Sequence, residues 1–107
     1  MKLTDDRAER ALRYLAETDE EAAQRKTDAE RAEFQAKAIR DAIMTRLEGG
    51  VTDRQAKAGA SQEYTSAMDC YFELLQKWEA MRNKRATEAI VIEIWRSLNA
   101  NRRAGNV

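Results

Sequence analysis

The sequence has no proline, no histidine, four glycines and a single cysteine in 107 residues. Because proline and glycine are the usual residues of tight turns, their scarcity argues against a many-stranded sheet and favours long helices. The lack of histidine removes the commonest general base and zinc ligand, and Cys70 alone cannot form an intrachain disulfide or a zinc site. We therefore expect an all-α protein that is not an enzyme and binds no metal or cofactor, although chemistry based on carboxylates alone stays open.

Long apolar runs and an excess of charge of one sign are also lacking. No apolar segment approaches the roughly 18 residues that a membrane span needs, and the first residues do not form a signal peptide. The 19 basic and 19 acidic side chains cancel, so any electrostatic function must come from local segregation of charge. By length we expect one helical domain over residues 1–107, in a reducing cytoplasm and without membrane contact.

Capping signals divide the chain into helices. Thr4 precedes two acidic residues, and Thr18 has Glu21 three positions later, so each predicts a helix start, with either a break or only a kink before Thr18. Gly49 and Gly50 predict a stop, after which Thr52 repeats the start signal. We expect helices over residues 5–16, 19–48, 53–60 and 62–103, with a turn at 49–51. Whether the last two helices are continuous stays open, because a helix tolerates one glycine.

Two apolar seams predict how these helices pair. The seam of the second helix is small in its first half, whereas the seam of the last helix is large and aromatic. Large side chains fill the space that small ones leave, so the two helices should form an elongated antiparallel hairpin of coiled-coil type, with a short N-terminal helix. The small seam comprises Ala22, Ala29, Ala32, Ala36, Ile39, Ile43 and Leu47, and the large one includes Tyr64, Tyr71, Leu74, Trp78 and Met81.

Between residues 88 and 98 the apolar side chains cover most of the circumference of the helix. A helix that is apolar nearly all round is buried nearly all round, and this short chain has few elements with which to cover it. We therefore predict a homo-oligomer interface here. The alternative is that the short first helix folds back over the segment. The predicted interface residues are Ala89, Ile90, Ile92, Ile94, Trp95 and Leu98.

The C-terminal segment is the basic part of the chain. Residues 80–107 carry six basic and two acidic side chains, a net charge of +4. Symmetry would multiply this charge into a platform for single-stranded nucleic acid, since guanidinium groups bind phosphate well. The alternative is an ordinary solvated helix face near a helix C-terminus. The basic residues are Arg82, Lys84, Arg85, Arg96, Arg102 and Arg103.

The order of these parts resembles the phage recombination mediators of the UvsY type, and also the small helical proteins that many tailed phages encode. In the mediators a Leu-Lys-Ala-Arg-Leu segment before a turn that contains tyrosine and glycine contributes to binding of single-stranded DNA. The matching segment here is Ala36-Lys37-Ala38-Ile39-Arg40. The resemblance implies that Lys37 and Arg40 also contact DNA.

The resemblance further implies a ring-like homo-oligomer in the cytoplasm of a bacterial host. Such a protein would help to exchange a single-strand-binding protein for a recombinase on DNA. A second interpretation is a helical assembly module or inhibitor that acts through protein–protein contacts and touches no nucleic acid. A third class, secreted hairpins with a Trp-x-Gly turn, does not fit because Leu47-Glu48-Gly49 occupies that place.

Overall fold

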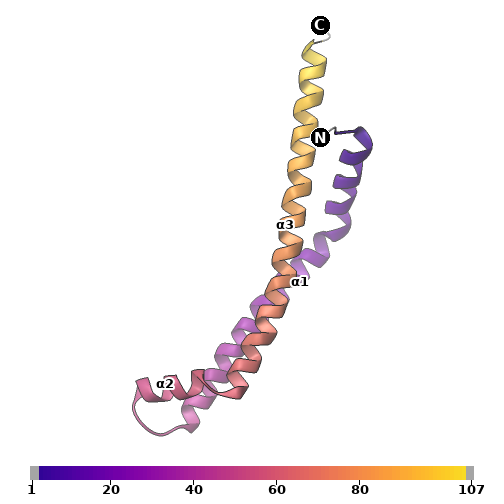
Figure 1. The fold of residues 1–107 in the computed structure, drawn as a ribbon. Helices are drawn as coiled ribbons and strands as arrows, with labels where there is room; N and C mark the ends of the chain where they lie inside the picture. Colours follow the sequence, from indigo (N-terminus) through magenta and orange to yellow (C-terminus); the bar gives the residue numbers. More distant parts are fainter. Residues whose placement is uncertain (1–2, 106–107) are drawn as a thin grey trace. The chain divides into compact units, whose positions relative to one another are not determined.

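A computed structural model describes residues 3–105, and these form three helices joined by short connections. The helices are α1 (Asp5–Arg46), α2 (Val51–Gly59) and α3 (Gln62–Gly105) (Figure 1). The described part of the chain contains no strand, so the predicted all-α class is confirmed. The chain divides into two compact units, of which unit 1 contains residues 3–22 and 79–105 and unit 2 contains residues 23–78.

The first helix begins where the sequence predicts but lacks the predicted break. The Thr4 Oγ1 accepts a hydrogen bond of 3.1 Å from the Arg7 amide, which is an N-cap contact. The prediction of separate helices over 5–16 and 19–48 was wrong, because α1 is continuous to Arg46. The Thr18 hydroxyl donates to the Tyr14 carbonyl at 2.7 Å, within the helix, instead of capping a new one.

The glycine turn ends α1 and leads directly into α2. Gly49 has a φ of 108°, which L side chains rarely adopt, and this explains why glycine stands there. The helix that was expected to start at residue 53 starts at Val51, and its N-cap is Gly50, without a side-chain hydrogen bond. The predicted cap at Thr52 is therefore wrong, since this residue already lies inside α2.

The structure answers the open question of continuity after α2. This helix ends at Gly59 and α3 begins at Gln62, so the two are separate. The Ser61 hydroxyl donates to the Ala58 carbonyl at 2.7 Å and accepts a hydrogen bond of 3.2 Å from the Tyr64 amide. One side chain thus binds the end of α2 and the start of α3.

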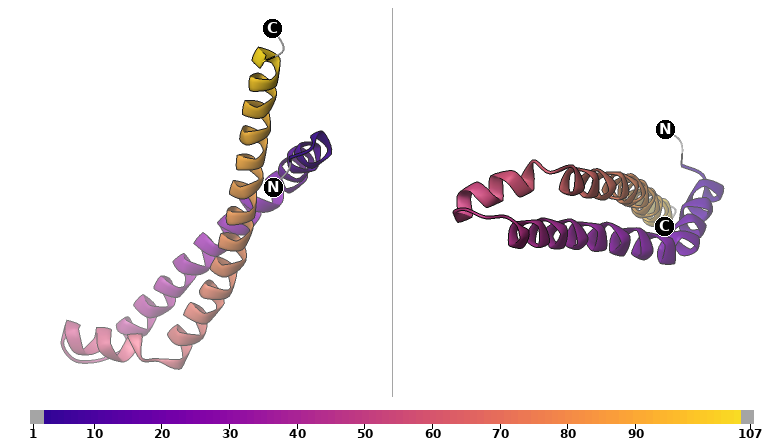
Figure 2. Two further views of the ribbon diagram at one scale, coloured as in Figure 1. Left: turned by 45° about the horizontal axis from the view of Figure 1, so that its top comes forward. Right: turned by 90° about the horizontal axis from the view of Figure 1, so that it is seen from below.

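Within unit 2 the alanine seam of α1 packs against α3. Ala29, Ala32, Ala36 and Ile43 are buried, whereas the aromatic residues of the α3 seam are half-buried. Two contacts show that the pair is antiparallel. The residue nearer the start of α1 contacts the residue further along α3, and the residue at the end of α1 contacts one at the start of α3. The Arg25 guanidinium lies 3.5 Å from the Lys77 carbonyl, and the Arg46 guanidinium lies 3.0 Å from Glu63. Figure 2 shows these segments side by side, joined through α2.

Within unit 1 the first turns of α1 pack against the last part of α3. A core cluster contains Ala11, Val91 and Ile92, and Leu3 and Leu15 pack against it. The Arg7 guanidinium forms an ion pair of 2.7 Å with Glu88, and the Trp95 indole donates to Asp5 at 2.8 Å. The order of these contacts is again antiparallel, so each unit contains a two-helix pair.

The alanine seam makes a testable prediction, because Ala36 is fully buried while Ala38 on the same helix is exposed. Ala36→Leu should lower the free energy of unfolding by about 1–3 kcal/mol, since the added carbon atoms force the helices apart. Ala38→Leu, the matched control, should change it by less than about 0.5 kcal/mol. Urea unfolding followed by circular dichroism measures both values. An equal effect at the two positions would contradict the close packing of the seam.

Candidate functional site

The apolar segment of α3 that the sequence predicts as an interface has two different sides in the structure. Val91 and Ile92 are each 6% exposed and lie in the core of unit 1. Ile90, Ile94 and Leu98 are 57%, 43% and 46% exposed. The first turns of α1 therefore cover one side of this segment, and the other side is open to solvent.

The helical repeat explains this division. At about 100° per residue, Ile90 and Ile94 each lie roughly 160° around the helix from Ile92. A single neighbouring helix covers only one side, so the residues opposite Ile92 stay exposed. The result is a row of three large aliphatic side chains, four residues apart along α3. We call Ile90, Ile94 and Leu98 the aliphatic row.

The six predicted interface residues thus fall into three groups. Ile92 is buried within unit 1. Trp95 is half-buried, and its indole Nε1 donates a hydrogen bond to Asp5. Ala89 is exposed but lies off the row, and the other three form the row itself. Among the six predicted interface residues, the members of the aliphatic row and Ala89 are therefore the ones that a second molecule can reach, and Ile92 is not.

Arg85, predicted to contact nucleic acid, is held by the chain itself. Its Nη1 donates to the Leu15 carbonyl at 2.9 Å and to the Thr18 hydroxyl at 2.6 Å, and its Nη2 donates to the Asp19 carboxylate at 3.1 Å. These bonds join α3 to α1 at the place where the sequence predicts a break. A guanidinium with three such partners is already satisfied and stabilises unit 1.

Two neighbouring basic residues have weaker partners. Arg82 lies 3.3 Å from Glu79, three residues earlier on the same exposed face. The Lys84 ammonium lies 4.5 Å from the centre of the Tyr14 ring, within the range of a cation–π contact. Both contacts are at the surface, where such pairs contribute little to stability and exchange readily with other partners.

Lys37 and Arg40 lie in unit 2, whereas the other six predicted residues lie in unit 1. Lys37 forms an exposed ion pair of 3.0 Å with Glu33, and the hydrogen bond from Lys37, followed by one from Tyr71, lowers the pKa of the Glu33 carboxyl below its ordinary value. The Arg40 guanidinium lies 6.0 Å from the centre of the Tyr64 ring.

The last turns of α3 carry the basic residues that are most accessible. Arg96, Arg102 and Arg103 are exposed and form no ion pair with any of residues 3–105. Trp95 lies opposite Asp5, the first residue of α1, so the turns that follow extend past the end of that helix (Figure 1). Arg102 and Arg103 therefore stand on a helix end without a neighbour in unit 1.

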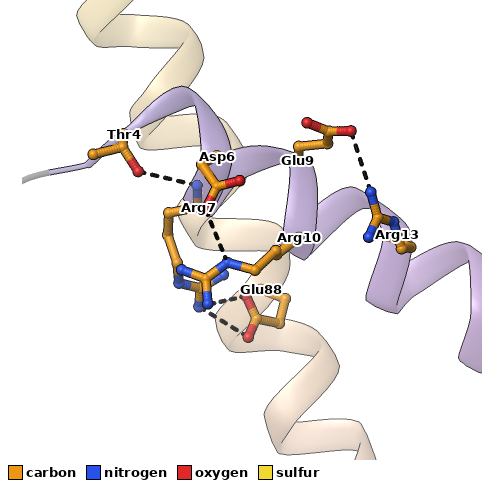
Figure 3. Close-up of polar contacts among 7 residues, drawn as sticks. All are labelled: Thr4, Asp6, Arg7, Glu9, Arg10, Arg13 and Glu88. Atoms are coloured by element: carbon orange, nitrogen blue, oxygen red, sulfur yellow. Dashed lines mark hydrogen bonds and ion pairs between the residues drawn. The ribbon is translucent and has the colours of Figure 1, made fainter.

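An ion pair between Arg7 and Glu88, which Figure 3 shows beside the surface pairs of α1, joins the two helices of unit 1 and was not predicted from the sequence. The Glu88 side chain is only 13% exposed, and both its oxygens face the same Arg7 nitrogen, at 2.9 and 2.7 Å. The partners are 81 residues apart in the chain. No spacing of three or four residues in the sequence indicates such a pair, so only the antiparallel register of the two helices could have predicted it.

Several other kinds of site are absent from the part of the chain that the structure describes. Residues 3–105 contain no pocket and no group of three acidic or cysteine residues that could hold a metal ion. Cys70 is exposed and has no disulfide partner. None of the three helices has a stretch long and apolar enough to cross a membrane.

The contacts of Arg85 predict a difference between two neighbouring arginines. Arg85→Ala should lower the free energy of unfolding by about 1–3 kcal/mol, because it removes charge-assisted bonds between α1 and α3. Arg82→Ala should change it by less than about 0.5 kcal/mol, because that ion pair is exposed. Thermal unfolding of the two variants measures the difference. Equal stability of both would show that Arg85 does not hold the helices together.

No family model, no curated protein and no solved structure matches this chain.

Proposed function

We propose that this chain is a helical accessory protein that works as a homo-oligomer and associates through the exposed side of α3. The observation that supports this proposal is the aliphatic row opposite the face that packs on α1. Three large aliphatic side chains on one helix face are the kind of patch that marks a protein contact rather than scattered surface residues. Its position leaves the core of unit 1 intact when a partner binds.

We expect the partner of the aliphatic row to be a second copy of the same chain. Each copy carries the same residues, so a symmetric contact buries the row twice and removes six aliphatic side chains from water. Complete burial of one such side chain contributes about 1.5–3 kcal/mol, and the row is roughly half-exposed to begin with. This gain is offset by the entropy lost on association, so we expect weak self-association, with a dissociation constant no lower than micromolar.

The first test of assembly is the mass of the protein in solution. Wild-type protein at tens of micromolar should elute from a sizing column with a light-scattering mass of a multiple of 12.3 kDa. Ile94→Asp should return it to the monomer without unfolding it, because Ile94 lies outside the core. The matched control is Ala16→Asp, at an exposed position of α1. A wild-type monomer, or an unchanged mass of the Ile94 variant, would contradict the proposal.

The second candidate function is binding of single-stranded DNA by the assembled protein. The observation in its favour is that Arg96, Arg102 and Arg103 are exposed and unpaired within the described residues. Assembly multiplies these charges, and the attraction to phosphates grows with the number of contacts. The resemblance to UvsY-type mediators supports the same function, and through it a role in replacing a single-strand-binding protein by a recombinase.

Two pairs of arginines separate DNA binding from a general effect of charge. Arg102→Ala with Arg103→Ala should weaken binding of a labelled single-stranded oligonucleotide and flatten its dependence on salt, whatever the base sequence. Arg10→Ala with Arg13→Ala removes the same charge but from residues paired with Asp6 and Glu9 (Figure 3), and it should have a smaller effect.

Fluorescence anisotropy over a series of salt concentrations measures both variants. Equal loss of binding in the two would show that the last turns of α3 have no special role. Wild-type protein that assembles but retains no oligonucleotide in low salt would favour the other interpretation, a module that acts through protein–protein contacts alone.

A further inference from the structure

The exposed side of α3 carries a continuous stripe of uncharged residues that includes Ile90 and Ile94, two of the three members of the aliphatic row. Its eight members follow one another at alternating intervals of three and four residues, the spacing of the contact face of a coiled coil. All eight are exposed. At 1.5 Å per residue the stripe is roughly 36 Å long. The members, which we call the stripe, are Ala80, Asn83, Thr87, Ile90, Ile94, Ser97, Asn101 and Ala104.

The stripe has nearly the same chemistry when read in either direction. From either end the order is alanine, asparagine, a hydroxyl residue and isoleucine, and it then reverses. The midpoint is the level of Ile92, and residue i corresponds to residue 184 − i. Ile90 thus corresponds to Ile94, and Thr87 corresponds to Ser97. In addition, the Thr87 hydroxyl already donates to the Asn83 carbonyl at 3.1 Å, so its burial leaves no unpaired donor.

We propose that this stripe packs against the same stripe of a second copy, with the two α3 helices antiparallel and a two-fold axis at the level of Ile92. This proposal rests on the self-association proposed above and specifies its geometry. In this register Ile90 meets Ile94 of the second copy, and Thr87 meets Ser97. At each end of the contact, an asparagine of one copy faces an asparagine of the other. Isologous contact requires such self-complementarity, since each residue pair occurs twice.

The extent of the paired segment agrees with this register. The paired segment runs from about residue 79 to residue 105, so it ends where α3 ends. The antiparallel register therefore uses the whole of α3 that belongs to unit 1.

A parallel pair explains these features less well. In a parallel pair every residue contacts the identical residue of the second copy, whatever the order of residues along the helix. A parallel pair therefore does not account for the symmetric order of the stripe. Continued toward the start of α3, the same spacing brings in Glu73 and Asp69, each opposite its like-charged copy. Parallel helices also align their dipoles unfavourably, whereas antiparallel helices oppose them.

The charges beside the stripe predict how salt affects the dimer. In the antiparallel register Glu93 approaches Glu93 of the second copy, and Lys84 approaches Arg102. These like charges are exposed and repel weakly, and added salt screens them. Dimerisation should therefore become tighter as salt rises, whereas binding of single-stranded DNA should become weaker.

Disulfide trapping tests the register directly. In full-length chains that carry Cys70→Ser, Thr87→Cys and Ser97→Cys are made separately, at two exposed positions that leave the core unchanged. Mixed and oxidised, the two variants should form a disulfide-linked dimer, because residues 87 and 97 lie at the same level. Neither variant alone should do so beyond background, since like residues are then ten positions, or roughly 15 Å, apart along the axis, beyond disulfide reach.

The possible results distinguish this geometry from self-association in general. Cross-linking of the Thr87→Cys variant alone, as efficient as that of the mixture, would overturn the antiparallel register in favour of a parallel one. A protein that sediments as a dimer but cross-links in no combination would place the contact elsewhere and overturn the stripe. A monomer at every concentration would overturn the proposed assembly together with its geometry.

Discussion

The packing of the first turns of α1 on one side of α3 is the contact on which the other features of unit 1 depend. Ala11 lies against Val91 and Ile92, and the bonds of Arg7 and Arg85 fix the same pair of helices. Because α1 covers only one side of α3, this contact determines which residues of α3 are buried in the core and which are exposed. The exposure of Ile90 and Ile94 is thus a consequence of the burial of Ile92.

The same contact separates the basic residues into two groups. Arg85 lies on the side that faces α1, and its guanidinium donates hydrogen bonds to Leu15, Thr18 and Asp19. Arg102 and Arg103 lie beyond the end of α1, where no partner within unit 1 reaches them. A stretch of sequence that looks uniformly basic therefore contains both arginines that hold the helices together and arginines that are exposed and have no ion pair within residues 3–105.

Much of the fold follows from local sequence signals. The alanine and aromatic seams predicted the antiparallel pairing, and Thr4 and Gly49 predicted a helix start and a turn. The break at Thr18 was predicted wrongly because a capping signal is also compatible with the interior of a helix, where the hydroxyl bonds to the preceding turn. Nothing local reveals that Arg85 binds at this place, since its partners on α1 are more than 60 residues away.

The candidate surface was predictable only in part, for a related reason. Composition showed that residues 89–98 have more apolar surface than one neighbour can cover, but it could not show which side α1 covers. Once Ile92 is known to be buried, the helical repeat places Ile90 and Ile94 outside. The symmetric order of the uncharged stripe was present in the sequence throughout, yet it has physical meaning only when these positions are known to share an exposed face.

The most direct test of this account is sedimentation equilibrium of the wild-type protein over a range of concentrations, in low and in high salt. The account predicts a reversible rise from the monomer mass of 12.3 kDa toward twice that value, at a lower concentration when salt is high. A mass that stays at 12.3 kDa up to several hundred micromolar would show that the exposed side of α3 has no second copy to cover it.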